Sequence, residues 1–333
     1  MGPTGIKLRR VMQDRSHPAL ELSPPDLDRW RGECAPSHVH RLTPAPRTPA
    51  EGPHAVICGL VHGNELCGGL ALEHMLTGGF RPARGVLTLI FANPGACARF
   101  DPAAPFVSRA EVEDFNRLWS PAVLDAPDRS PDHARAKALR PLVDQADALL
   151  DLHSTAGEEP PMILAGETAK SLALARRLGA PRDILIDAGH AEGVRLRDYG
   201  RFADPEHPAT ALLVECGQHW RAASLTTALE TVARFLDALD MLPSDDPVLP
   251  RPSAAAPPQR LLRVTHAVTV ETGPLRFTSP FQGGERIAEA GTTVAYDGAR
   301  AIATPYDDCI LVMPTRHAGP GQTAVRFAQA APL

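Results

Sequence analysis

The stretch CGLVHGNELCGG, Cys58–Gly69, places a histidine and a glutamate three residues apart, directly after the apolar run HAVICGL at 54–60. A short apolar run bounded by turn residues is typical of a buried parallel strand. The residues that follow, 65–79, have apolar side chains at helical spacing and end at a glycine pair. His62 and Glu65 are therefore expected at a strand-to-helix junction, where side chains at i and i+3 can face one point.

The alternation of strand and helix continues along the chain. Further strands are expected at 85–94, 147–154 and 211–217, and further helices at 132–146, 168–180 and 224–242. This order predicts an α/β fold with a mostly parallel or mixed sheet and helices on both faces.

The composition changes twice along the chain and suggests three parts. Residues 1–242 form the predicted α/β domain, including an N-terminal extension at 1–50. Residues 243–259 are rich in proline and alanine and are interpreted as a linker. Residues 260–333 alternate in the manner of strands, with Asp-Gly and Gly-Gly turns, and predict a small β domain. This domain has no lysine, which excludes a lysine-linked prosthetic group.

Charge and hydropathy exclude several classes of partner. The 333-residue chain has a formal charge of −5, with 34 basic and 39 acidic residues intermixed, so no basic stripe indicates a nucleic acid. No segment approaches the length of a membrane span and the N-terminus lacks a signal-like apolar run, so a cytoplasmic protein without a membrane partner is expected. Six scattered cysteines indicate reduced thiols. The oligomeric state is left open, a homo-oligomer included.

Polar side chains stand at the ends of three expected strands. His62 and Glu65 follow the first, His153 lies at the end of the strand at 147–154, and Glu215 lies near the end of the strand at 211–217. Ligand sites in open α/β sheets form at the carboxyl ends of the strands. Two histidines and one glutamate are an accepted ligand set for a hydrolytic zinc ion. Taken singly, each histidine fits an ordinary hydrogen-bonded loop residue equally well.

Glu215 is a carboxylate at the tip of an apolar strand. Such a charge is costly unless a cation or a proton partner lies nearby. Next to a metal-bound water, the carboxylate could act as a general base. The alternative is a helix cap or a salt bridge to an arginine.

The stretch RAEVEDFNRLW at 109–119 supplies further polar groups. Arg109 could donate to a carbonyl oxygen as it becomes an oxyanion, and Asn116 with Arg117 could bind a substrate carboxylate. Asp114 could orient a ligand histidine through the ring nitrogen that faces away from the metal. The alternative is an exposed charged loop with a helix cap.

Taken in order, these motifs resemble the succinylglutamate desuccinylase/aspartoacylase family of the zinc carboxypeptidase superfamily. The resemblance covers about residues 50–240 and rests on five blocks in sequence order. They are Gly59 with His62 to Glu65, Asn93-Pro94, Arg109 with Asp114 and Asn116-Arg117, Asp151 to His153, and Val214-Glu215 with Gly217.

The resemblance implies one Zn²⁺ per chain, bound by His62, Glu65 and His153, with Glu215 as general base. It also implies that Arg109 polarises the carbonyl and that Asn116 and Arg117 hold the substrate's carboxylate. The expected reaction is hydrolysis of a small N-acyl amino acid or a related amide. The β domain is expected to narrow the cleft and exclude polypeptides. The alternatives are a zinc carboxypeptidase acting on peptide C-termini and a non-catalytic zinc-binding regulatory protein.

Several positions depart from the family pattern or stay open. Arg99 lies in an inserted segment and is an alternative to Arg109 for the carbonyl. Cys216 replaces a usual aliphatic residue, whereas Cys58 and Cys67 are expected in the core. Ser154 lacks the G-x-S-x-G context of a nucleophile. The loops around residues 190–219 offer candidate substrate contacts, namely His190, Arg195, Arg197, Arg201, His207 and His219.

Overall fold

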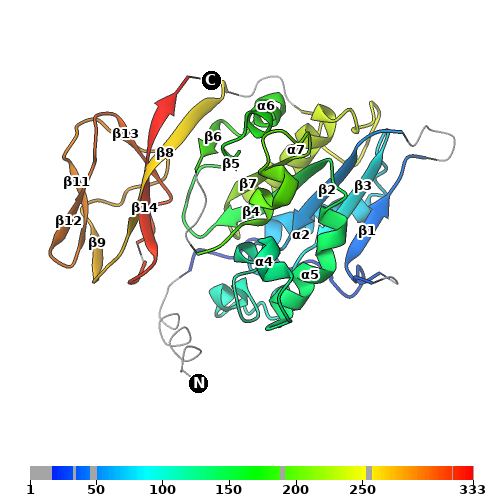
Figure 1. Cartoon of the computed structure of the whole chain (residues 1–333), viewed down its shortest axis with the longest axis horizontal. Helices are drawn as coiled ribbons and strands as arrows, with labels where there is room; N and C mark the ends of the chain where they lie inside the picture. Colours follow the sequence, from blue (N-terminus) through cyan, green and yellow to red (C-terminus); the bar gives the residue numbers. More distant parts are fainter. Residues whose placement is uncertain are drawn as a thin grey trace.

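The computed structural model describes residues 17–32, 35–45, 51–187, 192–252, 257–316 and 318–332 (Figure 1). His190 lies outside the described residues. The main helices are α2 (Leu66–Thr77), α5 (Pro131–Val143), α6 (Ala169–Leu178) and α7 (Ala222–Ala238), and the short ones are α3 (Pro94–Cys97), α4 (Pro121–Leu124), η1 (Pro105–Arg109), η2 (Phe115–Arg117), η3 (Leu196–Asp198) and η4 (Gly200–Phe202).

The strands form one large sheet and one small sheet. The large sheet has the order β1-β3-β2-β4-β7-β5-β6-β8-β14-β13-β10, and the small sheet has the order β12-β11-β9. Their bounds are β1 Val39–Leu42, β2 His54–Gly59, β3 Val86–Phe91, β4 Ala148–Thr155, β5 Met162–Leu164, β6 Asp183–Ile186, β7 Thr210–Gln218, β8 Arg260–Thr269, β9 Leu275–Phe277, β10 Arg286–Ile287, β11 Thr293–Asp297, β12 Arg300–Ala303, β13 Cys309–Val312 and β14 Thr323–Ala331.

The centre of the large sheet is parallel, because β3, β2, β4 and β7 pair in parallel register. β5 runs antiparallel to β7, which makes the sheet mixed. Parallel neighbours bring the carboxyl ends of β2, β4 and β7 to one edge. The predicted α/β class with a mostly parallel or mixed sheet is confirmed.

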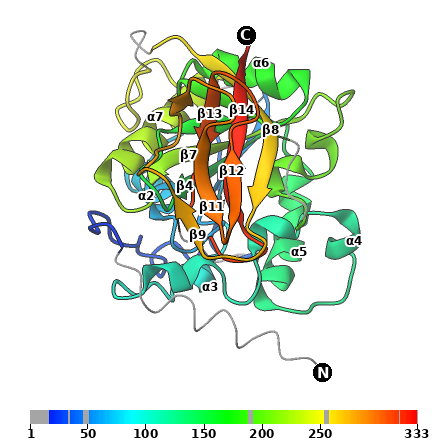
Figure 2. The ribbon, with the colours of Figure 1, turned by 90° about the vertical axis from the view of Figure 1, so that its left-hand side faces the viewer.

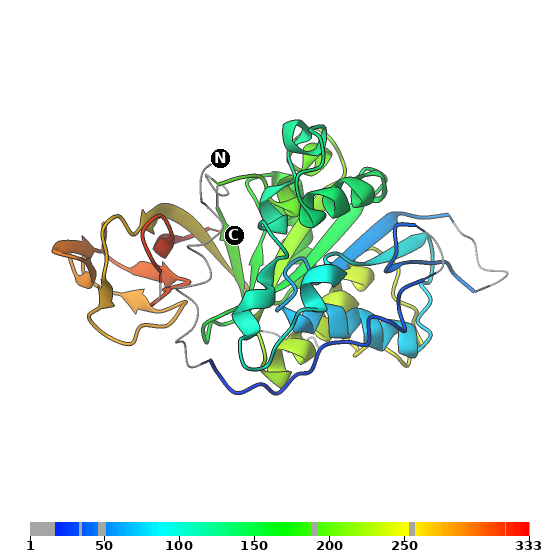
Figure 3. The same ribbon diagram turned by 90° about the horizontal axis from the view of Figure 1, so that it is seen from below.

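Helices cover both faces of the central strands (Figure 3). Alternate residues of a strand point to opposite faces, so Leu150 and Leu152 of β4 enter the core beneath α2, α6 and α7, whereas Leu149 enters the core beneath α5. β4 is buried along its whole length, and its first half is apolar whereas Asp151, His153, Ser154 and Thr155 place polar groups toward its carboxyl end. Among the described helices, none is long and apolar enough to cross a membrane.

Four C-terminal strands continue the large sheet, and the other three form the separate small sheet. β8 pairs in parallel with β6, and β14, β13 and β10 extend the sheet from there. The small sheet lies beside these strands (Figure 2). The predicted small C-terminal β sheet is confirmed, and β8 connects it to the α/β fold. The expected linker at 243–259 is partly packed, since Leu249 is buried in the main core.

Three strands of the α/β region, β1, β5 and β6, were not predicted from the sequence. β1 occupies an edge and pairs antiparallel with β3. β5 and β6 have only three and four residues, too few to show periodicity, yet they bridge β7 to β8. Both end at the pocket described below.

Candidate active site

The junction after β2 holds His62 and Glu65 in a tight turn. Gly63 lies so close to α3 that a Cβ atom there would overlap the backbone of Ala96 and Cys97. Glycine is therefore required for close packing at this turn, and the sequence analysis did not identify that reason. The backbone N–H of Glu65 donates to the carbonyl of His62 at 3.1 Å, and α2 begins directly after Glu65.

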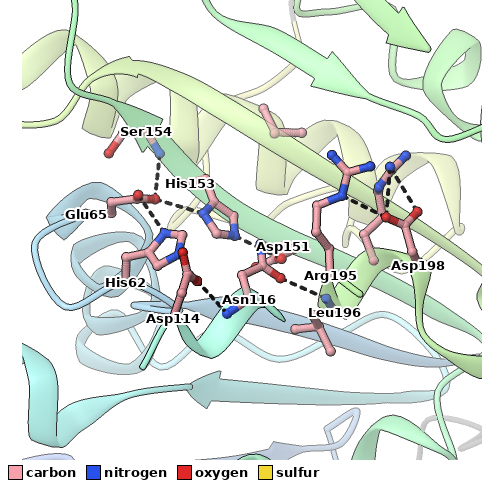
Figure 4. A network of polar contacts seen from close by, with 12 residues as sticks. His62, Glu65, Asp114, Asn116, Asp151, His153, Ser154, Arg195, Leu196 and Asp198 are labelled. Atoms are coloured by element: carbon pink, nitrogen blue, oxygen red, sulfur yellow. Dashed lines mark hydrogen bonds and ion pairs between the residues drawn. The ribbon is translucent and has the colours of Figure 1, made fainter. Parts of the chain in front are cut away.

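The side chains of His62, Glu65 and His153 converge on one point (Figure 4). One ligand atom from each lies within 4.8 Å of the others, and all three residues are buried. The Nδ1 atoms face the Glu65 carboxylate, at 2.7 Å for His62 and 2.9 Å for His153. Two imidazoles and a carboxylate converging in this way form a donor set that fits a divalent cation.

The other nitrogen of each ring faces a second carboxylate. Nε2 of His62 lies 3.0 Å from Oδ1 of Asp114, and Nε2 of His153 lies 2.9 Å from Oδ2 of Asp151. Such carboxylates fix the tautomer and orientation of a metal-binding imidazole. The contact of Asp151 was missed, although its signal was present: residues two apart on a strand share a face.

These contacts shift the ionisation of the cluster. Burial alone would raise the pKa of Glu65, but the nearby His62 and His153 hold that pKa well below its usual range. Burial opposes a charge on His153, yet Asp151 and Glu65 raise the pKa of His153 well above its usual value. The cluster thus binds positive charge strongly, as a cation site must.

Glu215 lies beside this cluster because β7 pairs with β4 in a register that sets Glu215 opposite His153. Its Oε2 is buried and has no hydrogen-bond partner among the described residues. Burial, reinforced by the charge of Glu65, raises the pKa of Glu215 to about 8. A partly buried carboxylate with one buried, unpartnered oxygen in a pocket is a candidate proton acceptor.

Arg109 reaches the same cluster from η1. Its Nη1 lies 3.3 Å from Oε1 of Glu65 and its Nη2 lies 3.0 Å from Oδ2 of Asp114, while 40% of its side chain remains exposed. The alternative, Arg99, is exposed, donates to the carbonyl of Glu111 and does not line the pocket. Of the two arginines, only Arg109 is in position to contact a substrate.

The loop that carries Arg109 and Asp114 is fixed by Asp132 at the start of α5. Asp132 is fully buried and accepts hydrogen bonds from three successive backbone N–H groups at 111–113, at 3.2, 2.7 and 3.1 Å. It also accepts from the side chain of Asn93 at 2.6 Å. Sequence spacing gave no signal for this long-range anchor.

Asn116 and Arg117 lie on η2 and both line the pocket. The side-chain oxygen of Asn116 accepts from the backbone N–H of Leu196 at 2.8 Å, which leaves its amide nitrogen free to donate (Figure 4). Nε of Arg117 lies 3.6 Å from Glu192. The pair therefore presents donors from one wall.

The pocket has a volume of about 730 Å³ and extends from the cluster to the C-terminal strands. The C-terminal region lines it with Phe281, Gln282, Met313, Pro314, Thr315, Arg316, Gln322, Thr323 and Arg326. The N-terminal extension contributes Pro18. Leu164 and Leu185, near the ends of β5 and β6, and Leu213, in the middle of β7, also line it.

The arginines of the 190–204 segment are largely engaged within the protein. Arg195 binds Asp187 through two nitrogens and Asp198 through a third (Figure 4). Arg197 pairs with the same two carboxylates, and Arg201 donates to a backbone carbonyl. Arg195 is the one member of this trio that lines the pocket.

His207 and His219 differ in position. His207 accepts a local hydrogen bond from the N–H of Ala209 and does not line the pocket, whereas His219 is buried and lines it. Nδ1 of His219 lies 2.8 Å from the hydroxyl of Ser154. Burial lowers the pKa of His219 to about 4, so its imidazole is neutral at pH 7.

The cysteines near the cluster are buried. Cys58 and Cys67 are core residues, as predicted. Cys216 faces the α2 and α7 side of the sheet, away from Glu215, as the alternation along β7 requires.

Together, the mixed α/β sheet and the buried His-Glu-His cluster at its carboxyl edge define a hydrolase-like fold with a candidate divalent-metal centre. The family model for the succinylglutamate desuccinylase/aspartoacylase catalytic domain matches residues 51–239, more than half of the chain. The chain belongs to this family of acyl-releasing hydrolases. A comparison with curated protein sequences finds no match.

Solved structures support the fold. A succinylglutamate desuccinylase from Vibrio cholerae superposes with a TM-score of 0.64 at 19% identity, over 88% of this chain and 85% of that one. The desuccinylase from Vibrio parahaemolyticus gives 0.62 at 19% identity, over 88% and 86%. A succinylglutamate desuccinylase/aspartoacylase from Rhodobacter sphaeroides gives 0.62 at 17% identity, over 88% and 89%.

Proposed function

We propose that this protein is a zinc-dependent deacylase that hydrolyses the amide bond of a small N-acyl amino acid. His62, Glu65 and His153 are the proposed ligands of one zinc ion per chain, which would supply Lewis-acid activation of water and of the scissile carbonyl. Family membership supports the reaction class, and the converging donor set supports the metal.

The chain's own residues have distinct proposed roles. Glu215 takes a proton from the attacking water and passes it to the departing nitrogen. Arg109 donates to the carbonyl oxygen as negative charge develops on it. Asn116 and Arg117 hold the carboxylate of the amino acid, the arginine through its planar fork. Asp114 and Asp151 orient the two histidines.

The observation that carries the proposal is the position of Glu215. It is a partly buried carboxylate whose Oε2 is buried and unpartnered within the described residues, one strand away from His153 and in the same pocket as Arg109 and Asn116. A regulatory protein that only bound zinc would have no use for a general base beside the cluster. The arrangement therefore favours catalysis.

The test is turnover of matched N-acetyl, N-succinyl and N-formyl amino acids by the zinc-loaded protein and its Glu215→Gln variant. Loss of general-base catalysis should lower kcat by at least about 10²-fold while the zinc content stays at one per chain. Unchanged turnover in Glu215→Gln would remove the proposed base. Peptides with free C-termini belong in the same panel, since release of terminal residues would instead indicate a carboxypeptidase.

A further inference from the structure

One wall of the pocket is aromatic: Phe106 and His219 line it, and both rings pack on the buried ring of Trp220. The ring centroids of Phe106 and His219 lie 6.4 Å apart, those of Phe106 and Trp220 lie 5.0 Å apart, and those of His219 and Trp220 lie 5.4 Å apart. Trp220 is fixed in turn by its indole N–H, which donates to the carbonyl of Asn64 at 3.1 Å. This wall is rigid and adjoins the turn that carries Glu65.

His219 is held in a defined orientation on this wall. Its Nδ1 contacts the hydroxyl of Ser154 at 2.8 Å, and the backbone N–H of Ser154 donates to Oε2 of Glu65 at 3.1 Å. Its own backbone N–H donates to Thr155 at 2.9 Å. Within the described parts of the chain, Nε2 has no hydrogen-bond partner, although the side chain lines the pocket. Nε2 is therefore free to bind a substrate atom.

This wall lies opposite the proposed carboxylate clamp. Trp220 belongs to the core on the α2 and α7 side of the sheet. Asn116 lies on the other side: its neighbour Phe115 and its hydrogen-bond partner Leu196 both belong to the core on the α5 side. A substrate whose carboxylate binds at Asn116 and whose carbonyl lies at the metal cluster must direct its acyl group toward His219.

The charges on the acyl side disfavour an anionic group. Ser154, Phe106 and Trp220, which contact His219, are all uncharged, and the nearby pocket-lining segment carries Glu158, whose carboxylate pairs with Arg221 at 3.0 Å. The other arginines that line the pocket, apart from Arg109, come from the clamp side or from the C-terminal region. A carboxylate at the end of the acyl group would meet Glu158, and Arg221 is already paired with Glu158 and Glu21.

We propose that His219, backed by Phe106, is the specificity-determining residue for the acyl group, and that this wall selects short uncharged acyl groups over dicarboxylic ones. The imidazole donates from Nε2 to an acyl-group or carbonyl oxygen, and the aromatic rings limit the length of the acyl chain. The inference rests on the proposed deacylase function and specifies its substrate.

Binding to the zinc-loaded Glu215→Gln variant, measured by calorimetry, separates recognition from turnover. The ligands are N-acetyl and N-succinyl forms of the same amino acids, for example leucine, glutamate and arginine. The N-acetyl form should bind at least about tenfold more tightly in each pair, because one unpaired acyl carboxylate costs at least one hydrogen bond's worth of affinity. Equal binding, or tighter binding of the N-succinyl form, would overturn the inference.

Two substitutions in the same background test the residue itself. His219→Asn keeps a polar group near Ser154 but loses the donor at the Nε2 position, and should weaken N-acetyl binding about tenfold. His219→Gln restores a donor at that position and should recover most of the affinity. Equal losses in both, or a loss in neither, would contradict a contact with the acyl group. Zinc content and the thermal midpoint show whether either variant is misfolded.

A separate variant tests whether the charge of Glu158 affects the preference for the acyl group. Glu158→Gln should narrow the N-acetyl over N-succinyl ratio several-fold, whereas Glu206→Gln, which removes an exposed acid outside the pocket, should leave the ratio unchanged. An unchanged ratio in Glu158→Gln would remove the electrostatic part of the inference. If N-acetyl amino acids bind with this preference but wild-type protein turns over none of the panel, the deacylase proposal fails while the acyl specificity of the wall stands.

Discussion

The side chains at the two ends of the pocket are held in place by different kinds of interaction. At the metal-cluster end, carboxylates and imidazoles alternate: Asp114, His62, Glu65, His153 and Asp151 lie in a continuous series of contacts of 2.7 to 3.0 Å. At the C-terminal end, the buried acid Glu159 is packed against the backbone at Gly283. The first end is organised by charge, and the second by close packing.

Glu159 shows how little charge compensation exists at the second end. Its carboxyl lies so close to Gly283, between β9 and β10, that a Cβ atom at Gly283 would overlap it. Oε2 has no hydrogen-bond partner in the described structure. Burial raises the pKa of Glu159 to about 7, although backbone N–H groups of Met313 and Gly283 favour its ionised form. Glu159 therefore takes up a proton near neutral pH while it is packed against a C-terminal loop.

The largest expected effect comes from removing a ligand at the charged end. A structural zinc site contributes about 10–16 kcal/mol over four ligands, so one ligand contributes roughly 2.5–4 kcal/mol. His153→Ala should therefore weaken zinc binding by about 10²–10³-fold, as measured by competition with a chromogenic chelator.

The matched control is His266→Ala, which removes an exposed histidine of β8. It should bind zinc as the wild type does. Retention of stoichiometric zinc at wild-type affinity by His153→Ala would show that the three side chains do not share an ion, and with it the contrast between the two ends would lose its basis.

Much of the charged end could be predicted from sequence because its residues stand at recognisable positions. His62, Glu65, His153 and Glu215 follow long apolar strands, and the ends of such strands are where α/β proteins bind ligands. The structure brings all four into one pocket. Asp151 could have been added by the two-residue period of a strand. Asp132 could not, because nothing local indicates that a helix start will bind a loop about 20 residues earlier.

The C-terminal end was less predictable for a physical reason. β5 and β6 are too short to show alternation, and their pairing joins segments that are far apart in the sequence. The contact of Glu159 with Gly283 depends on that pairing. Local pattern therefore identified a β region after residue 260, but gave no information on how it closes the pocket or that β8 extends the main sheet.

Glu159 is expected to make stability fall as the pH rises. Its pKa in the folded chain is about 7, above the ordinary value of 4.5, so the folded state binds the proton more tightly than the unfolded state does. The stabilisation is fully present below about pH 4.5 and is lost as the pH rises toward 7. Over this interval the contribution of Glu159 to the free energy of unfolding decreases by about 3 kcal/mol. Urea unfolding at intervals between pH 4.5 and 8 measures it.

Other groups titrate in the same range, so the informative quantity is a difference. Glu159→Gln preserves the shape of the protonated acid and cannot ionise. The free energy of unfolding of the wild type, relative to this variant, should decrease between pH 4.5 and 7 and level off above about pH 8. If this difference in the free energy of unfolding does not depend on pH, the Glu159 carboxyl is not held in a buried, uncompensated position. The contrast between the two ends of the pocket would then be lost.

The smallest of these effects concerns the two carboxylates that orient the histidines. Asp151 is fully buried, and its oxygens have no hydrogen bond in the described structure apart from the contact with His153, whereas the side chain of Asp114 is 27% exposed and also contacts Arg109. Asp151→Asn should weaken zinc binding about 10–100-fold, the range found for such supporting groups. Asp114→Asn should cost less, because solvent screens its charge. Chelator competition on both variants decides the order. A larger loss in Asp114→Asn would mean that the exposed contact network, rather than burial, fixes the geometry of the charged end.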